Sequence, residues 1–255
     1  MTDTQRLSQF FDQYAEVENK YFLKPALRNL IGMAVLKMYL PEEGKVLDAG
    51  CGTGRDAYFF STPRLHFSCL DISGRMIETA RKNCSQKNCD FRVADIREIP
   101  FEANSFDCSI SLGDGVSFCL NDYEKAISEL CRVTKNGGTI IIGVDNLYGK
   151  LVNSVSNGNF AEARRILKKR EAIELSEEFP VRCFDIEEFK IIAMNNGLEV
   201  LKVVPVISSL YNYRSSKLNE NFKKDIINLE QEIIRCNLFS WGGDHTIYVL
   251  RKLFT

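Results

Sequence analysis

The segment from Val46 to Gly54 constrains the fold of this chain more than any other part of its sequence. It reads Val-Leu-Asp-Ala-Gly-Cys-Gly-Thr-Gly, a short apolar strand followed by glycines at alternate positions, and a helical pattern comes next. Glycines let the backbone turn tightly and let a ligand approach the free N–H groups at the start of a helix. A glycine-rich turn with only a structural role is the alternative. The segment therefore predicts a strand, a ligand-binding turn and a helix in succession.

Short apolar runs alternate with helical patterns along most of the chain. We expect strands at 45–49, 65–70, 90–94, 106–112, 139–144, 198–206 and 245–250, and helices at 54–60, 73–83, 122–134 and 185–196. Strands that alternate with helices require crossover connections, which produce a mostly parallel sheet. The fold class predicted from this pattern is α/β.

The same pattern divides the chain into four parts. We expect an N-terminal helical cap at 1–43, the core that carries the glycine-rich turn at 44–147, a helical lid insertion at 148–184, and the end of the core at 185–255. Within the lid, no strand is expected over 148–179. The last part contains a second helical insertion at about 208–243.

Composition excludes several classes of protein. The 255 residues include 33 Lys and Arg against 34 Asp and Glu, so the net charge of −1 gives no global attraction to nucleic acid, although a local basic groove stays open. Nine scattered cysteines without a C-x-x-C pair fit reduced thiols and offer no zinc or redox motif. No run of about 18 apolar residues occurs, so we expect a cytoplasmic protein without a membrane partner, as monomer or homodimer.

Three acids each follow a predicted parallel strand. Asp48 stands just before the glycines, where a carboxylate repels a pyrophosphate but attracts a cationic or amino-bearing ligand. Asp71 ends the second strand and can accept hydrogen bonds from both hydroxyls of a ribose. Asp95 can accept from the exocyclic amine of adenine, with Ile96 packed on the ring. Together these acids indicate a nucleoside with a positive or amino-bearing tail.

A dinucleotide site is the competing interpretation. Gly52-x-Gly54-x-x-Ala57 satisfies the relaxed dinucleotide fingerprint, and Asp71 lies 19 residues beyond Gly52. However, this register starts two residues late relative to the end of the strand, and it gives the acid before the glycines no role. The nicotinamide or flavin interpretation is therefore the weaker one.

Five segments together resemble those of a known family. They are LDAGCGTG, LDIS, ADI, SFDCSISLGDGVSF and ELCRVTKNGGTIII. They are similar to the cofactor loop, the ribose and adenine motifs, and the fourth and fifth strand regions of class I S-adenosylmethionine-dependent methyltransferases, over about residues 44–145. Asn136 departs from the proline that the family usually has in a structural turn. The resemblance implies a Rossmann-like three-layer sandwich, with a seven-stranded, mostly parallel sheet whose last strand is antiparallel. It also implies S-adenosyl-L-methionine as cofactor and S-adenosyl-L-homocysteine as product.

The resemblance also assigns residues to the cofactor. The residues that it implies are Gly50, Cys51 and Gly52 at the methionine moiety, Asp71 at the ribose, Asp95 and Ile96 at adenine, and Leu112 and Gly113 in the reactive methionine region. Asp48, Ile72 and Met76 are further cofactor candidates. Met76 can lie against the sugar or the base, with a core methionine as the alternative. In small-molecule members an N-terminal tyrosine often closes over the cofactor. Tyr14 or Tyr21 can do so here, although a core aromatic is an equal alternative.

Methyl transfer from a sulfonium is an in-line displacement that needs alignment and exclusion of water, and a base only for some nucleophiles. The catalytic candidates are His245, before the last strand, and Asp145 and Tyr148, after the fifth. His66 is expected to be structural. Asp114 is a lone acid that does not make a metal site, so no metal is expected.

The acceptor is expected to meet the parts outside the core. The candidate substrate-binding residues are Asn146, Arg182, Tyr211 and Arg214, whose arginines can clamp an anionic acceptor. We predict methyl transfer to an oxygen, nitrogen or carboxylate of a small molecule. The order of lid, Tyr-Arg segment and charged helix is also similar to tRNA wobble-uridine carboxylate methyltransferases, in which the basic cluster 164–170 would contact tRNA phosphates. A non-catalytic cofactor-binding or partner-binding protein is the third hypothesis.

Overall fold

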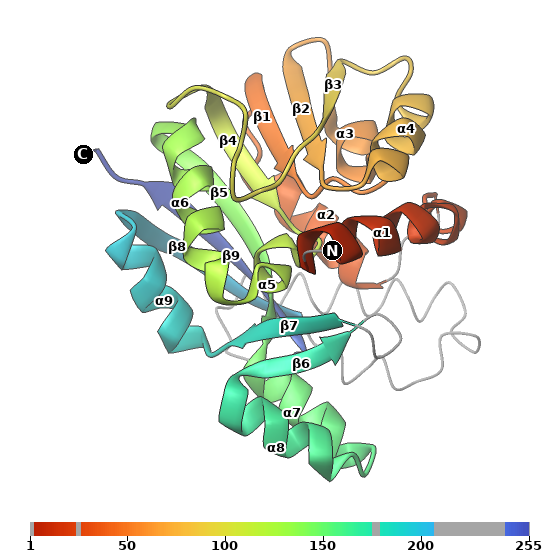
Figure 1. The fold of residues 1–255 in the computed structure, drawn as a ribbon. Helices are drawn as coiled ribbons and strands as arrows, with labels where there is room; N and C mark the ends of the chain where they lie inside the picture. Colours follow the sequence, from red (N-terminus) through yellow and green to blue (C-terminus); the bar gives the residue numbers. More distant parts are fainter. Residues whose placement is uncertain (1–2, 24–26, 175–178, 207–242, 255) are drawn as a thin grey trace, which may run out of the picture.

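The computed structural model describes residues 3–23, 27–174, 179–206 and 243–254 (Figure 1). Its helices are α1 Asp3–Lys20, α2 Leu27–Tyr39, α3 Arg55–Phe60, α4 Gly74–Asn83, α5 Gly115–Phe118, α6 Tyr123–Val133, α7 Leu147–Ser156, α8 Phe160–Lys169 and α9 Ile186–Asn195, with a 3-10 turn at Leu120–Asp122. Its strands are β1 Gly44–Ala49, β2 Leu65–Asp71, β3 Cys89–Val93, β4 Phe106–Ser111, β5 Thr134–Asn146, β6 Glu171–Glu174, β7 Phe179–Phe184, β8 Leu198–Val206 and β9 His245–Lys252.

The sheet has the predicted mixed character. Neighbouring strands follow the order β3-β2-β1-β4-β5, all parallel, and β9 pairs antiparallel with both β5 and β8. Because β1 lies between β2 and β4, the carboxyl ends of the first four strands meet at one edge, with the glycine-rich turn in the middle. The predicted α/β fold with an antiparallel last strand is therefore confirmed.

The insertion at 148–184 differs from the expectation of a lid without strands. After α7 and α8 the chain forms an antiparallel hairpin of β6 and β7, and the end of β7 pairs parallel with the end of β5 (Figure 1). Arg170, with φ of 59°, ends α8 in the left-handed conformation and turns the chain into β6. In β7 the residues Phe179, Val181 and Cys183 are buried in alternation, which is the period of a strand. Over the described residues the sheet consequently has nine strands rather than seven.

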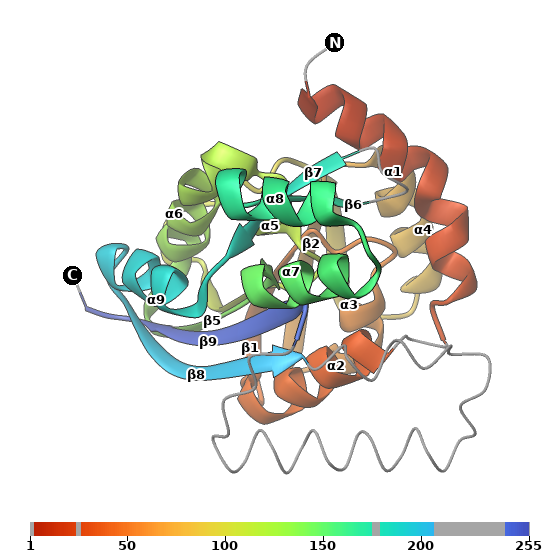
Figure 2. The same cartoon turned by 90° about the horizontal axis from the view of Figure 1, so that it is seen from below.

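Helices cover both faces of the sheet (Figure 2). One buried apolar cluster joins α6 and α9 to one face, and a second joins α2, α3 and α4 to the other. The isoleucine run of β5 serves both clusters, because Ile140 and Ile142 face the first and Ile141 faces the second. Burial on both faces explains why this strand reads as a continuous apolar run.

The structure also bears on the cysteines and on membrane-spanning helices. The eight cysteines among the described residues are free thiols. Within the described ranges, no helix combines the length and the apolar character that crossing a membrane requires.

Candidate functional site

A cavity of about 410 Å³ opens where the parallel strands end. This volume falls within the range of small-molecule sites, about 300–1,000 Å³. Its wall is formed by α1 and α2, by the loops after β1 to β4, and by the start of β9. The predicted site residues in this wall are Tyr14, Gly50, Cys51, Gly52, Asp71, Ile72, Met76, Asp95, Ile96, Leu112, Gly113 and His245. The structure thus brings together residues from distant segments, and their individual roles remain predictions.

The glycine-rich turn leaves room for a ligand. Gly50 has a φ of +81°, and no heavy atom lies within 4 Å of the position that a Cβ would take there. Gly52 has a φ of +52°, and its Cβ position would lie 2.5 Å from Glu18 Oε1. The N–H of Gly52 donates to Asp71 Oδ2 at 2.9 Å, so the predicted ribose acid also holds the turn. A side chain at either glycine would strain the backbone and fill the approach to the cavity.

Buried carboxyls give this part of the site its electrostatic character. Burial raises the pKa of Asp71 to about 6, although backbone N–H groups of Ser73 and Gly52 work in the opposite direction. Burial likewise raises the pKa of Asp56 to about 6 and raises that of Asp48. Asp48 lies behind the turn and outside the cavity wall, and its Oδ2 has no hydrogen-bond partner within the described ranges. Such carboxyls favour a ligand that brings hydroxyl donors or a positive charge.

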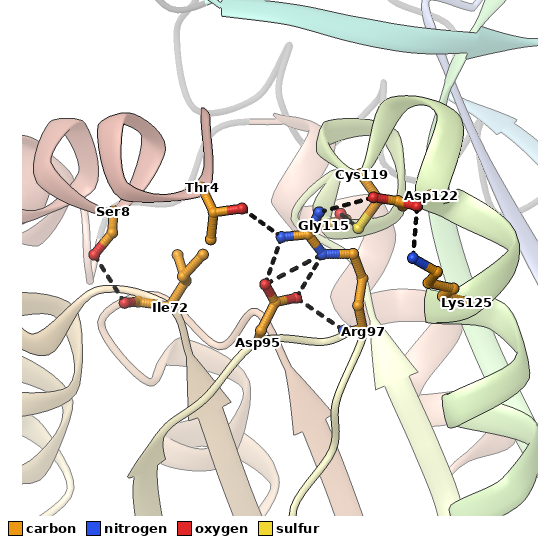
Figure 3. A network of polar contacts seen from close by, with 9 residues as sticks. All are labelled: Thr4, Ser8, Ile72, Asp95, Arg97, Gly115, Cys119, Asp122 and Lys125. Carbon is orange, nitrogen blue, oxygen red and sulfur yellow. Dashed lines mark hydrogen bonds and ion pairs between the residues drawn. The ribbon is translucent and has the colours of Figure 1, made fainter. Parts of the chain in front are cut away.

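At the opposite end of the cavity, Arg97 holds Asp95 (Figure 3). The Arg97 Nη2 atom lies 2.5 Å from Asp95 Oδ2 and 2.7 Å from Thr4 Oγ1, and Nη1 lies 3.4 Å from Asp122 Oδ2. Partial burial opposes ionisation of Asp95, but the hydrogen bonds from Arg97 prevail and lower its pKa. The predicted adenine acid is therefore a fixed carboxylate. Arg97 itself was not predicted, because a single arginine in a loop gives no sequence signal.

Helix α1 contacts the loops after β1, β2 and β3 through polar side chains. Besides the Thr4 contact, Ser8 Oγ donates to Ile72 O at 3.0 Å (Figure 3). Asp12 Oδ1 accepts from Ser73 Oγ at 2.6 Å and from the Arg75 N–H at 3.0 Å. Glu18 Oε1 lies 3.5 Å from Thr53 Oγ1. The sequence predicted a helical cap here without these contacts, since polar residues on a helix are usually solvated.

Beyond β4, an imidazole–carboxylate contact and an ion pair lie next to each other. His245 Nδ1 is 2.8 Å from Asp114 Oδ1, and Lys150 Nζ is 2.9 Å from Asp145 Oδ1. One ligand atom each of Asp114, Asp145 and His245 lies within 4.8 Å of the other two. Asp114 is therefore not the lone acid that the sequence indicated. Its partner arrives from β9, 131 residues away, which no local pattern reveals.

Of the other predicted residues, those with described positions, such as Asn146, Tyr148 and Arg182, lie outside the cavity wall. Asn146 is buried and caps α7 by accepting from the N–H groups of Tyr148 and Gly149. Tyr148 is 40% exposed. Arg182 is ion-paired with Glu188 at 2.5 Å. Tyr211 and Arg214 lie outside the described residues.

The sequence of the chain is similar to those of known proteins. A family model described as a methyltransferase domain matches residues 46–138. An uncharacterised protein of Methanocaldococcus jannaschii, MJ1123, is 31% identical over 172 residues, which cover 66% of this chain and 78% of that protein. A malonyl-[acyl-carrier protein] O-methyltransferase of Buchnera aphidicola is 40% identical over 97 residues, covering 38% of this chain and 37% of the relative.

Two further similarities bear on the fold and the acceptor. A tRNA (carboxymethyluridine(34)-5-O)-methyltransferase of Arabidopsis thaliana is 38% identical over 106 residues, which are 41% of this chain and 25% of that protein. A solved structure from Thermotoga maritima, described as an SAM-dependent methyltransferase and possible histamine N-methyltransferase, has a TM-score of 0.63 at 22% identity. That match covers 96% of this chain and 99% of the other, and it shows the same fold. The relatives of named activity share the core with this chain but differ in what they methylate.

Proposed function

Because the chain belongs to the class I S-adenosylmethionine-dependent methyltransferases, we propose that it methylates an oxygen or nitrogen of a small molecule, with His245 accepting the proton of that group. The observation that carries the proposal is the contact of 2.8 Å between His245 and Asp114 in the wall of the cavity. A carboxylate beside an imidazole is the arrangement that general-base catalysis uses.

We expect the adenine, ribose and methionine parts of the cofactor to lie along the cavity in the order of the strands. The adenine acid Asp95 follows β3, the ribose acid Asp71 ends β2, and the glycine-rich turn follows β1. The next strand in the sheet is β4, and Leu112 and Gly113 follow it in the cavity wall. The methionine end of the cofactor would extend past the turn toward these two residues. Gly50 leaves an open approach there. The acceptor then belongs on the β4, β5 and β9 side, next to His245.

When bound, S-adenosylmethionine supplies a methyl group that is already activated by the positive sulfur. The remaining tasks fall to the protein: holding the two reactants in line and excluding water, which can contribute about 7 to 11 kcal/mol in favourable cases. Phe11 and Tyr14 of α1 and Phe118 of α5 cover the cavity with apolar surface, which keeps water from the reacting atoms.

The two ring nitrogens of His245 have different surroundings. Its Nδ1 lies 2.8 Å from Asp114 Oδ1, and a proton on that nitrogen would leave an electron pair on Nε2. Nε2 lies over Gly143, where a Cβ would come within 2.5 Å of it. An acceptor hydroxyl can transfer its proton to Nε2 as its oxygen takes the methyl group, with the sulfur as leaving group. An ammonium would first have to give its proton to Nε2, so that its nitrogen has an electron pair for the attack. A carboxylate acceptor would carry no proton to remove.

The rest of the wall favours an acceptor with an apolar body. Leu7 and Phe11 of α1, Phe118 of α5 and Ile247 of β9 line the cavity. The anionic clamp expected from Arg182 receives no support, because its guanidinium pairs with Glu188. An aromatic or aliphatic alcohol or amine matches this lining better than an anion does.

Radiolabelled methyl transfer tests the proposal. The protein would be incubated with methyl-labelled S-adenosylmethionine and a cell extract, which is then divided into RNA and small-molecule fractions. We expect label in the small-molecule fraction, and its loss in His245→Gln while S-adenosylhomocysteine still binds. His66→Gln is the matched control, because His66 lies away from the cavity wall and pairs with Asp90. Label confined to RNA, or full transfer by His245→Gln, would contradict the proposal.

A second candidate, transfer to tRNA, is favoured by α8. Arg164, Lys168 and Lys169 are exposed on this helix, and the Arabidopsis relative is named for a tRNA acceptor. Phosphate contacts are electrostatic and weaken with salt. If tRNA is the acceptor, Lys168→Glu with Lys169→Glu should reduce label in the RNA fraction and its salt dependence, without changing binding of S-adenosylhomocysteine.

A further inference from the structure

Three charged side chains in the wall of the cavity have no part in the function described so far. They are Glu18 in the last turn of α1, and Arg55 and Asp56 at the start of α3. Burial raises the pKa of Asp56, while the positive charge of Arg55 opposes this rise and the negative charge of Glu18 adds to it. Both neighbours therefore lie within electrostatic range of Asp56, and the three side chains form one charged group.

This group lies beside the glycine-rich turn. Glu18 Oε1 is 3.5 Å from both the backbone N and Oγ1 of Thr53, and a Cβ on Gly52 would lie 2.5 Å from the same oxygen. Arg55 directly follows Gly54, the last glycine of the turn. The turn follows β1, which lies between β2 and β4 in the sheet. A cofactor that extends from the end of β2 toward the end of β4 therefore passes the turn, where Glu18 and Arg55 line the cavity.

The amino-acid end of the cofactor needs a positive partner in this part of the cavity. It carries a carboxylate, and the acidic groups of Glu18, Asp56 and Asp71 in the surrounding wall would repel a second negative charge. Among the described residues, two arginines line the cavity, Arg55 and Arg97. Arg97 is engaged at the adenine end by the three side chains described above. Arg55 is therefore the guanidinium beside the turn.

Arg55 also has unused capacity for hydrogen bonds. Within the described ranges no hydrogen bond or ion pair fixes its guanidinium, although its Nε atom is buried. A guanidinium presents N–H donors in a planar fork that matches the two oxygens of a carboxylate. A carboxylate in the cavity would give Arg55 a partner of opposite charge, and would itself be shielded from the acids around it.

The ammonium of the same amino-acid end can find its partner in Glu18. The sequence predicts a negative partner at Asp48, but Asp48 lies behind the turn and outside the cavity wall. Glu18 lies in the wall, and its contacts with Thr53 are long, at 3.5 Å, so that its oxygens keep electron pairs for a stronger donor. Because Glu18 belongs to α1, this contact would also attach the helical cap to the bound cofactor.

We propose that Arg55 and Glu18 bind the two charged groups at the methionine end of S-adenosylmethionine, Arg55 the carboxylate and Glu18 the ammonium. The two side chains thereby select ligands with a complete amino-acid end and hold the methionine chain beside the turn. The inference concerns the cofactor. Of the proposed function it rests only on the binding of S-adenosylmethionine, and not on His245 or on the acceptor.

Calorimetry with three ligands tests this assignment without a known acceptor. S-adenosylhomocysteine carries both charged groups, its decarboxylated analogue carries only the ammonium, and methylthioadenosine carries neither. We expect the wild type to bind S-adenosylhomocysteine about ten- to a hundredfold more tightly than the decarboxylated analogue, as hydrogen bonds between charged groups provide. This comparison needs no variant, so it tests the proposal even if a substitution prevents folding.

Variants separate the two charged groups. Arg55→Met should lose affinity for S-adenosylhomocysteine alone, since only that ligand carries the carboxylate, and Arg55→Lys should retain part of this affinity because it keeps the charge. Glu18→Gln should lose affinity for both ligands that carry the ammonium and bind methylthioadenosine like the wild type. The matched controls are Arg64→Met and Glu16→Gln, whose side chains are 67% and 83% exposed and lie outside the cavity wall. Both should bind all three ligands like the wild type.

Several results would overturn the proposal. Equal affinity of the wild type for S-adenosylhomocysteine and its decarboxylated analogue would show that no cation binds the carboxylate. A preference that survives in Arg55→Met, or an unchanged affinity for the ammonium ligands in Glu18→Gln, would remove the role of that residue. Equal losses for all three ligands in either variant would indicate a structural role alone.

The proposed function fails separately from this inference. If His245→Gln retains methyl transfer, the proposed base is refuted while the three-ligand comparison keeps its meaning. If the wild type binds none of the three ligands, the assignment of Arg55 and Glu18 falls together with the cofactor.

Discussion

Gly143 in β5 is the residue on which the position of the proposed base depends. A Cβ at this position would lie 2.5 Å from His245 Nε2 and 2.9 Å from Leu112 O. The backbone atom cannot move freely, so Gly143→Ala should displace the imidazole and cost about 1 to 3 kcal/mol of unfolding free energy, as overpacking does.

Thermal unfolding and labelled methyl transfer measure both effects. We expect a lower melting temperature and at least a tenfold loss of transfer for Gly143→Ala. Gly74→Ala is the matched control, because nothing lies within 4 Å of its Cβ position. If the two variants behave alike, the close packing of His245 on Gly143 is not important.

Asp71 is the residue on which cofactor binding should depend most. Its two oxygens already accept from the N–H groups of Gly52 and Ser73, each at 2.9 Å. Each remaining electron pair can accept from a ribose hydroxyl, and a hydrogen bond to a charged group contributes about 1.5–3 kcal/mol. Calorimetry should therefore show at least a tenfold loss of affinity for S-adenosylhomocysteine in Asp71→Ala. Asp90→Asn, outside the cavity wall, should bind like the wild type. Equal affinity of Asp71→Ala and wild type would exclude Asp71 as the ribose acid.

At the level of elements, α1 should act as a cover whose polar contacts slow release of the cofactor. Asp12 accepts from Ser73 and from the Arg75 N–H, at the start of the helix that follows Asp71, the predicted ribose acid. Asp12→Ala should therefore speed dissociation of S-adenosylhomocysteine about three- to tenfold, as one or two charge-assisted hydrogen bonds would. Glu16→Ala is the matched control, since that side chain is 83% exposed and lies 3.7 Å from Arg75. Stopped-flow displacement measures both rates, and equal rates would show that α1 does not restrain the ligand.

Helices and strands were predictable where the sequence pattern is typical of one kind of element and one kind of burial. Ile140, Ile141 and Ile142 read as a strand buried on both faces, and β5 is such a strand. The hairpin of β6 and β7 was missed although Phe179, Val181 and Cys183 alternate, because the surrounding residues are polar and the preceding segment is helical. Its pairing with the end of β5 involves only two residue pairs, which no local pattern announces.

At the level of the whole molecule, contacts between residues close in the sequence were predictable, and contacts between distant residues were not. The predicted cofactor residues lie in contiguous strand-loop-helix units, and Asp71 and Asp95, which follow strands, both line the cavity. The pair of Asp114 and His245 exists only because β9 pairs with β5, and Lys150 reaches Asp145 only through the inserted α7. Contacts that depend on tertiary pairing in this way have no signature in a single sequence.

The balance of charge across the molecule leads to a last prediction, on pH and stability. Burial raises the pKa of Asp56 and Asp71 to about 6, so without ligand each stabilises the fold when protonated, below about pH 4, and this stability is lost as the pH rises through 6. A rise from the ordinary aspartate value to about 6 corresponds to about 3 kcal/mol per group at most. The lowered pKa of Asp95 acts in the opposite direction, since its stabilisation is lost only as the pH falls below its ordinary range.

The ligand-free protein should therefore lose several degrees of melting temperature between pH 5 and pH 7.5. S-adenosylhomocysteine brings an ammonium and two ribose hydroxyls to these carboxylates, so it should raise the melting temperature more at pH 7.5 than at pH 5. Differential scanning fluorimetry across this range, with and without ligand, measures both trends. In Asp71→Asn the pH dependence should flatten, because the amide does not ionise. A ligand effect that is independent of pH would mean that these buried carboxylates do not face the cofactor.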